Sequence, residues 1–210
     1  RVSSISREDG SWVISDGEGV YYADQVISTI PLQHLLPCLP DVPLSVQAAC
    51  DGLRYNSLIS VCIGFAGPAP PLSWIYIPDM QNGYFNRISF PSNYSDAVAP
   101  AGHASVLAEI TYNEGDAVCS LSDQEIIDHT VSHLTAMGII AGPDAVVHTS
   151  LARSAFAYVV YDCAYLENSA IVRSYLESIG IHCVGRFSEF SYLNMDGCIQ
   201  SAFSFMEQFT

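Results

Sequence analysis

The sequence contains no lysine, and its seven basic residues are all arginine. Schiff-base and pyridoxal-phosphate chemistry need a lysine amine, so both are excluded for this chain. Acidic residues number 22, and the formal net charge is -15 at pH 7. Because this charge repels phosphate groups, nucleic acids and anionic membranes are excluded as expected partners.

Long apolar runs and closely spaced cysteine pairs are also missing. Glycine, proline, serine or aspartate interrupts every apolar run before it reaches the roughly 18 residues that a membrane-spanning helix needs. The seven cysteines include no Cys-x-x-Cys pair, which favours free thiols in a reducing compartment and predicts a cytoplasmic protein. The chain opens at Arg1, inside a predicted strand and without an initiator methionine, so we expect it to be a piece of a longer protein.

The composition, 50% hydrophobic and 14% charged, is that of a folded globular protein. Near the start of the chain, short strands separated by turns are predicted at 2–6, 11–15, 20–23 and 24–30. Pro31 ends the last of these strands, because proline lacks the amide proton that a strand needs. Prolines recur at 37, 40 and 43, which predicts an irregular crossover there.

The middle of the chain carries the period-two alternation of strands with one buried face. Strands are predicted at 57–65, 74–77, 84–90, 103–112 and 144–161, the last with a break near Ser154. A capping box of Ser122 and Glu125 predicts one helix, and further helices are predicted at 166–178 and, after a short strand at 181–184, at 194–209. The predicted fold class is α+β: a mixed, largely antiparallel sheet with packed helices, beside a smaller layer formed by both ends of the chain.

The most informative motif lies between the strand predicted at 181–184 and the final helix. Gly185 and Arg186 follow the strand, and Asn194, Met195 and Asp196 begin the helix. A guanidinium beside the free amides of a helix N-terminus suits an anion or an electron-rich carbonyl. On spacing alone, the same motif also fits a strand-loop-helix unit whose arginine forms a surface ion pair.

The stretch 184–199, VGRFSEFSYLNMDGCI, resembles the C-terminal flavin-binding motif of the UDP-galactopyranose mutases and of the related amine-oxidase and protoporphyrinogen-oxidase-like proteins. A second specific resemblance is ADQVISTIP at 23–31. Weaker ones extend over nearly the whole chain, at 55–61, 74–79, 87–89 and 158–161. The resemblance implies the C-terminal part of an FAD-dependent oxidoreductase or of a UDP-galactopyranose mutase-like enzyme, with a Rossmann-like cofactor domain.

Carried over position by position, the resemblance implies the cofactor-binding residues Gly185, Arg186, Asn194, Met195 and Asp196. Arg186 would lie near the FAD pyrophosphate, and the amides around Met195 and Asp196 would face the flavin. Tyr192 matches a tyrosine that contacts the substrate's diphosphate in the mutases.

Four further residues are candidates for binding the substrate, namely Arg87, Arg153, Trp74 and Tyr161. The two arginines could bind a diphosphate through bidentate hydrogen bonds, and the aromatic rings could line a pocket for a sugar or a nucleotide base. Cross-strand ion pairs and aromatic packing would explain the same residues without a ligand.

Two features depart from the family pattern. The N-terminal Gly-x-Gly-x-x-Gly segment that holds the ADP half of FAD is missing, so this chain should bind FAD weakly or not at all without the missing N-terminal FAD-binding segment. The absence of lysine also weakens the case for amine oxidation, because many amine oxidases place a lysine near the flavin N5.

The predicted domains follow from this reading. Residues 1–36 and 181–210 are assigned to the FAD domain, and 37–180 to a substrate-binding domain for a small molecule such as a nucleotide sugar. The alternative function is a non-catalytic binding or assembly module that kept the fold and lost the cofactor. No metal site is expected: His129 and His133 lie one helical turn apart, but they lack the adjacent glutamate of a His-Glu-x-x-His motif.

Overall fold

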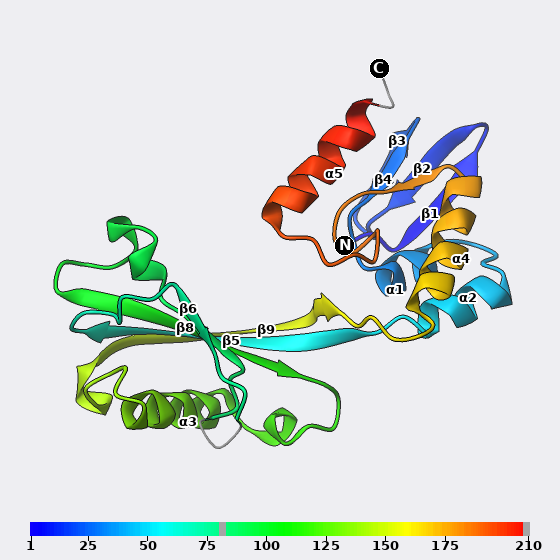
Figure 1. The fold of residues 1–210 in the computed structure, drawn as a ribbon. Helices are drawn as coiled ribbons and strands as arrows, with labels where there is room; N and C mark the ends of the chain where they lie inside the picture. The colour runs from blue at the N-terminus through cyan, green and yellow to red at the C-terminus, as the bar shows by residue number, and fades with distance from the viewer. Residues whose placement is uncertain (80–82, 208–210) are drawn as a thin grey trace. The chain divides into compact units, whose positions relative to one another are not determined.

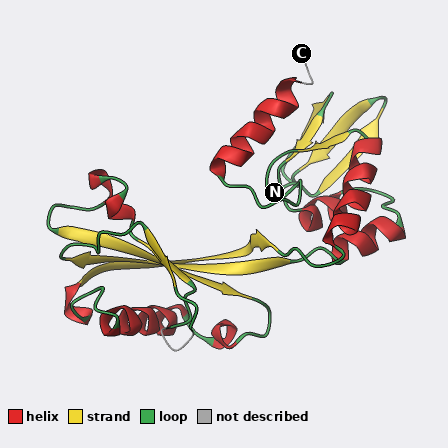
Figure 2. Cartoon of the chain, in the orientation of Figure 1, coloured by secondary structure: helices red, strands yellow, loops and turns green. Residues whose placement is uncertain are grey.

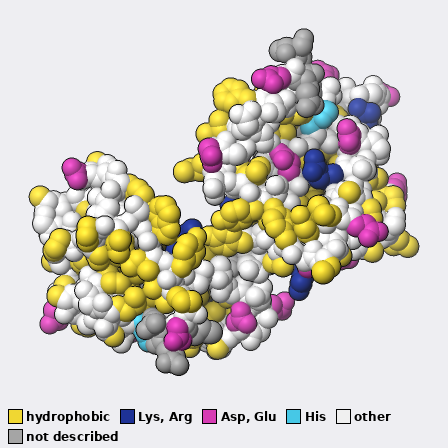
Figure 3. All heavy atoms as spheres, in the orientation of Figure 1, with side chains coloured by type: hydrophobic (Ala, Val, Ile, Leu, Met, Phe, Trp, Pro, Cys, Tyr) yellow, Lys and Arg dark blue, Asp and Glu magenta, His cyan; other side chains and the backbone are white. Residues whose placement is uncertain are grey.

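The computed structural model describes residues 1–79 and 83–207. The chain divides into two compact units, each drawn as a ribbon in Figures 1 and 2. The first unit holds Arg1–Tyr55 and the residues from Tyr158 onward, and the second holds Asn56–Ala157. On the face shown in Figure 3, acidic side chains are spread over both units and arginines are few, as the net charge requires.

Two small sheets lie in the first unit. β1 (Ser4–Glu8), β2 (Ser11–Ser15) and β3 (Val20–Ala23) form an antiparallel meander. β4 (Val26–Ser28) pairs in parallel with β10 (Ile181–Cys183), so the two ends of the chain share one sheet. This pairing confirms the predicted layer formed by both termini.

Helices of the first unit pack around these sheets. They are α1 (Leu32–Leu35), the 3-10 turn η1 (Leu36–Cys38), α2 (Leu44–Asp51), α4 (Tyr165–Ser178) and α5 (Met195–Glu207). The core of the unit includes Ile5 and Trp12 from the meander, Leu176 from α4 and Ile181 from β10. Its members come from both ends of the chain, so neither end can form this core alone.

The second unit contains a sheet with the strand order β6-β7-β8-β5-β9. These strands are β5 (Tyr55–Ala66), β6 (Trp74–Tyr76), β7 (Arg87–Ser89), β8 (His103–Tyr112) and β9 (Val146–Val159). Along β5, Ile59, Val61, Ile63 and Phe65 are buried and alternate with less buried residues. The pairs β6-β7, β7-β8 and β5-β8 are antiparallel, which fits the predicted largely antiparallel sheet.

The helix α3 (Asp123–Ala136) packs on this sheet and begins at the predicted capping box. The Ser122 side chain accepts a hydrogen bond from the Glu125 amide (3.3 Å), and the Ser122 amide donates one to the Glu125 carboxylate (2.8 Å). Shorter elements of this unit are the 3-10 turns η3 (Pro91–Asn93), η4 (Asp96–Val98), η5 (Ala117–Ser120) and η6 (Pro143–Ala145). The α+β class is confirmed.

Two predictions about secondary structure are wrong. Residues 31–43 are not an irregular crossover, because α1 begins after Pro31 and α2 after Pro43. Proline fits a helix start, where an amide would have no partner within the helix. β9 also runs past Ser154 without a break. The small residues around Ser154 lie on the exposed part of an edge strand.

The boundaries of the compact units differ from those predicted at 36/37 and 180/181. Residues 37–55 and 158–180 belong to the same unit as the chain ends, since α2 and α4 pack in its core. The end of the predicted final helix, 208–210, lies outside the described residues. The assignment of one unit to the cofactor and the other to the substrate stays a prediction.

Candidate functional site: the Gly185-Arg186 turn and the start of helix α5

The turn after β10 places Arg186 and depends on a glycine. Gly185 has a φ of +82°, a left-handed conformation that glycine adopts without the steric penalty of a side chain. No atom lies within 4 Å of the position that a Cβ would take there, so the backbone angle, not space, requires the glycine. Phe190, with a φ of +50°, bends the chain a second time before it reaches α5.

Arg186 lies among aromatic rings. Its guanidinium carbon is 4.7 Å from the ring centre of Tyr192, 5.1 Å from that of Tyr158 and 5.9 Å from that of Phe187. Nη1 donates a hydrogen bond to the Leu193 carbonyl (3.0 Å), two residues before α5 begins. Cation-π attraction and this bond together hold the guanidinium beside the helix start.

Tyrosines extend this aromatic group. The rings of Tyr158 and Tyr192 are stacked with centres 5.8 Å apart, and the Tyr192 amide donates a hydrogen bond to the Tyr161 hydroxyl (2.6 Å). Tyr161 is 50% exposed and Tyr192 46%. The structure therefore brings two of the predicted substrate-binding residues, Tyr161 and Tyr192, together with Arg186 on a half-exposed aromatic surface.

Tyr55, which begins the 55–61 resemblance but was not predicted as a site residue, contacts the turn that carries Arg186. Its hydroxyl donates a hydrogen bond to the Phe187 carbonyl (3.0 Å), and its ring packs edge-on against Phe190 at 5.1 Å. Burial raises the pKa of the Tyr55 hydroxyl far above its ordinary value, so it acts as a neutral donor. No local pattern marks this residue, because its partners lie more than 130 positions away in the sequence.

The first turn of α5 presents free amides. The first helical hydrogen bond runs from the Cys198 amide to the Asn194 carbonyl (3.0 Å), so the amides of Met195, Asp196 and Gly197 come before the ladder of helical bonds. Met195 is 85% exposed. A helix N-terminus next to a held guanidinium suits the anionic groups of a flavin nucleotide, so the donors present fit such a cofactor.

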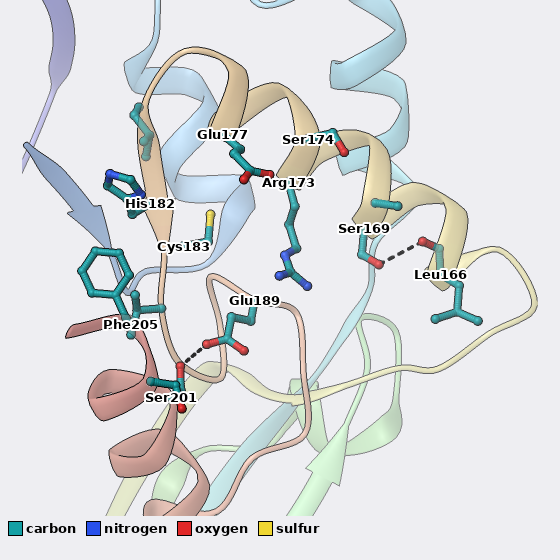
Figure 4. A pocket seen from close by; sticks show the side chains of 14 residues that line it. Leu166, Ser169, Arg173, Ser174, Glu177, His182, Cys183, Glu189, Ser201 and Phe205 are labelled. Atoms are coloured by element: carbon teal, nitrogen blue, oxygen red, sulfur yellow. Dashed lines mark hydrogen bonds between the residues drawn. The ribbon is translucent and has the colours of Figure 1, made fainter. Parts of the chain in front are cut away.

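A polar cavity of about 650 Å³ lies beside this turn, between α4, β10 and α5. Figure 4 shows Arg173 of α4 and Glu189 of the turn pointing into it. Arg186 and Met195 are not among its lining residues. Burial raises the pKa of the Cys183 thiol in its wall, which keeps that thiol protonated and argues against a reactive cysteine there.

The other predicted substrate residues lie in the second unit, and both arginines form ion pairs. Arg87 binds both carboxylate oxygens of Glu109 (2.5 and 2.7 Å) across the β7-β8 pair. Arg153 on β9 binds Asp123 (2.9 Å) at the start of α3. Trp74 lies on β6 and is 55% exposed. The ion pairs give both arginines a structural role, and their role toward a substrate stays a prediction.

Replacing Arg87 with methionine is expected to destabilise the protein by about 2 kcal/mol, because the buried Glu109 carboxylate loses its bidentate partner. The measurement is the free energy of unfolding in urea, with Arg54→Met as a matched control. The ion pair of Arg54 with Asp162 is exposed, so its loss should change stability by less than about 1 kcal/mol. Equal stability of the two variants would contradict a structural role for Arg87.

The His129 ring on α3 stacks on Tyr84 with ring centres 4.3 Å apart, and it lies tilted against the His133 ring with centres 4.2 Å apart. Burial, and then the neighbouring His133, lowers the pKa of His129, so its ring is neutral near pH 7. Within residues 1–79 and 83–207, no group of three or more potential metal ligands gathers.

In the same residues, no helix is long and apolar enough to cross a membrane. All seven cysteines are free thiols.

Comparison with known proteins gives the family. The model of the family described as flavin containing amine oxidoreductase matches residues 1–204. This chain therefore belongs to the flavin containing amine oxidoreductases. No curated protein sequence matches the chain.

Three solved structures share the fold. A reduced UDP-galactopyranose mutase has a TM-score of 0.77 and 23% identity, with 90% of this chain and 41% of that chain covered. A protein of Exiguobacterium sp. 255-15 that carries the name of a protoporphyrinogen oxidase has a TM-score of 0.78 and 20% identity, with 99% and 46% covered. A putrescine oxidase variant has a TM-score of 0.69 and 15% identity, with 99% and 47% covered. The chain thus spans less than half the length of each structure.

Proposed function

We propose that this chain is the C-terminal part of an FAD-dependent enzyme, in which the first unit contacts the flavin and the second unit covers the substrate. The observation that carries the proposal is the Arg186 guanidinium, held by the Leu193 carbonyl beside the free amides of α5. Gly185 and Arg186 would bind the pyrophosphate, and the amides of 194–196 would face the flavin ring. The family match supports the cofactor class.

The chain's own residues would orient the ligands. The helix N-terminus would stabilise negative charge on a bound flavin, and the guanidinium would neutralise its phosphates. Tyr161 and Tyr192 of the first unit would contact a small-molecule substrate, and Arg87, Arg153 and Trp74 of the second unit stay candidates for substrate binding. When bound, the flavin supplies the redox or mutase chemistry of such enzymes. The structural likeness to a UDP-galactopyranose mutase supports a nucleotide sugar as one substrate class to test.

The proposal also needs the segment that binds the ADP half of FAD, and the parallel sheet offers a place for it. The Val184 amide donates a hydrogen bond to the Ser28 carbonyl (3.0 Å), so Val26 and Ser28 face β10. Because successive residues of a strand face opposite edges, the amide and carbonyl of Ile27 point away from β10. Within the described residues, β4 pairs with β10 alone.

The surroundings of the two outer edges differ in charge and polarity. Ile27 of β4 is 48% exposed, and Val20, Tyr21 and Tyr22 of β3, which precedes β4 in the chain, are also exposed. The β10 edge lies in the polar cavity with Arg173, Glu177 and Glu189. Charged groups discourage strand addition, and parallel strands are apolar and buried. We therefore propose that a strand of this segment would add to the outer edge of β4.

A titration with FAD tests the proposal. The 210-residue chain alone should quench FAD fluorescence weakly or not at all, and a longer polypeptide that includes the glycine-rich segment should bind FAD tightly. If the longer polypeptide is folded and still fails to bind FAD, the chain is instead a binding or assembly module that kept the fold and lost the cofactor.

A further inference from the structure

Glu189 closes the turn that carries Arg186. Its carboxylate accepts a hydrogen bond from the Gly185 amide (2.6 Å), and its own amide donates one to the Gly185 carbonyl (2.9 Å). The Ser191 amide donates a hydrogen bond to the Arg186 carbonyl (2.9 Å). The Gly185 amide and the carbonyls of Gly185 and Arg186 are therefore all held by hydrogen bonds to Glu189 and Ser191 of the same turn.

The same carboxylate joins the turn to α5. The Ser201 hydroxyl, in the middle of α5, donates a hydrogen bond to the Glu189 oxygen that the Gly185 amide also reaches. The Gly185 amide lies 3.1 Å from the Ser201 oxygen as well, which completes a three-membered group. Figure 4 shows the Glu189 and Ser201 side chains pointing toward one another. One carboxylate thus ties the end of β10 to the final helix.

The Glu189 carboxylate links the two elements that are proposed to bind the flavin, the Gly185-Arg186 turn and the N-terminus of α5. Arg186 immediately follows Gly185, and the free amides of α5 lie about one and a half helical turns before Ser201. A carboxylate bonded to both elements fixes the distance between the guanidinium and those amides. The guanidinium bond to the Leu193 carbonyl fixes the other end of the same loop.

We infer that Glu189 is a positioning residue, which sets the Gly185-Arg186 turn against helix α5 and so preorganises the flavin site. The inference rests on the proposed function for its effect on FAD, whereas the coupling of the turn to α5 is a property of the protein without the cofactor. Glu189 acts through Gly185 and Ser201 and is not itself proposed to touch the ligand. Preorganised donors bind more tightly because less conformational entropy is lost on binding.

Three variants of the longer protein separate positioning from bulk stability. Glu189→Leu removes the acceptor at similar size, and Glu189→Gln keeps one oxygen acceptor for the Gly185 amide and the Ser201 hydroxyl. Glu177→Leu removes a carboxylate from α4 that lines the same cavity but belongs to a different element. Ser201→Ala, which removes only the link to α5, replaces Glu189→Leu if that variant fails to fold.

The measurements are amide hydrogen exchange without cofactor and the FAD dissociation constant. In Glu189→Leu, exchange at Gly185 should accelerate at least about tenfold and the dissociation constant should rise about tenfold, because small misplacements of ligand-binding groups are costly. Glu189→Gln should recover most of both effects, and Glu177→Leu should resemble the wild type. Unchanged exchange at Gly185 in Glu189→Leu would overturn the inference. If Glu189→Leu accelerates exchange at Gly185 but the wild-type protein binds no FAD, only the proposed function is contradicted.

Discussion

Replacing Arg186 with alanine in the longer protein is expected to weaken FAD binding by one to two orders of magnitude while the protein stays folded. A charge-assisted hydrogen bond to a phosphate contributes roughly 1.5 to 3 kcal/mol, which corresponds to about 10- to 150-fold in the dissociation constant. The side chain lies against rings that are themselves half-exposed, so its loss leaves the buried core intact. The measurement is the ratio of flavin to protein after dialysis, with circular dichroism to verify the fold.

Arg54→Ala provides the matched control. Arg54 belongs to the same unit and forms an exposed ion pair with Asp162 at 3.3 Å. Removing it should leave the flavin content unchanged, because an exposed pair contributes about 0 to 1 kcal/mol to stability and none to the site. Unchanged flavin content in a folded Arg186→Ala variant would contradict the cofactor role of Arg186 and most of the case for α5 as a flavin contact.

Proline at Ile27 is expected to destabilise the longer protein by roughly 3 kcal/mol and to leave the 210-residue chain nearly unchanged. Proline removes the amide proton at the outer edge of β4 and blocks the approach of a neighbouring strand. In the chain alone, that amide points away from β10, so no bond to β10 is lost. The measurement is the midpoint of thermal unfolding for both proteins, together with the FAD content of the longer one.

Cys183→Pro is the control for this substitution. The Cys183 amide points to the outer edge of β10, where charged residues and two helices surround the strand. Proline there should affect the longer protein and the chain alone to the same extent. A larger effect of Cys183→Pro in the longer protein than in the chain alone would indicate that the added strand pairs with β10 instead.

Much of the fold could be predicted from local patterns. The alternation of Ile59, Val61, Ile63 and Phe65 matches a strand with one buried face, and the Ser122 capping box starts a helix as expected. The prediction of an irregular crossover at 31–43 was wrong because proline is found both after strands and at helix starts. The sequence of 31–43 alone does not distinguish the two. The predicted break near Ser154 was wrong because small polar residues also suit an exposed edge strand.

The site was predictable only in part, since its contacts join distant segments. The Gly185-Arg186 turn and the start of α5 follow one another in the sequence, and the motif marked both. The Tyr161 hydroxyl meets the Tyr192 amide across 31 positions, and Tyr55 reaches the Phe187 carbonyl across 132. The Glu189 carboxylate bonds its neighbour Gly185, but its link to Ser201 requires the folded path of α5. Such contacts depend on tertiary structure, which no local pattern encodes.

The cofactor content of the longer protein, purified without added flavin, decides whether this chain is part of an FAD-dependent enzyme. The visible absorption spectrum before and after heat denaturation gives the amount of released flavin per chain, and chromatography against standards identifies it. We expect flavin absorption bands and close to one FAD for each folded chain. A folded, colourless protein that releases no flavin and takes up none on incubation would contradict it.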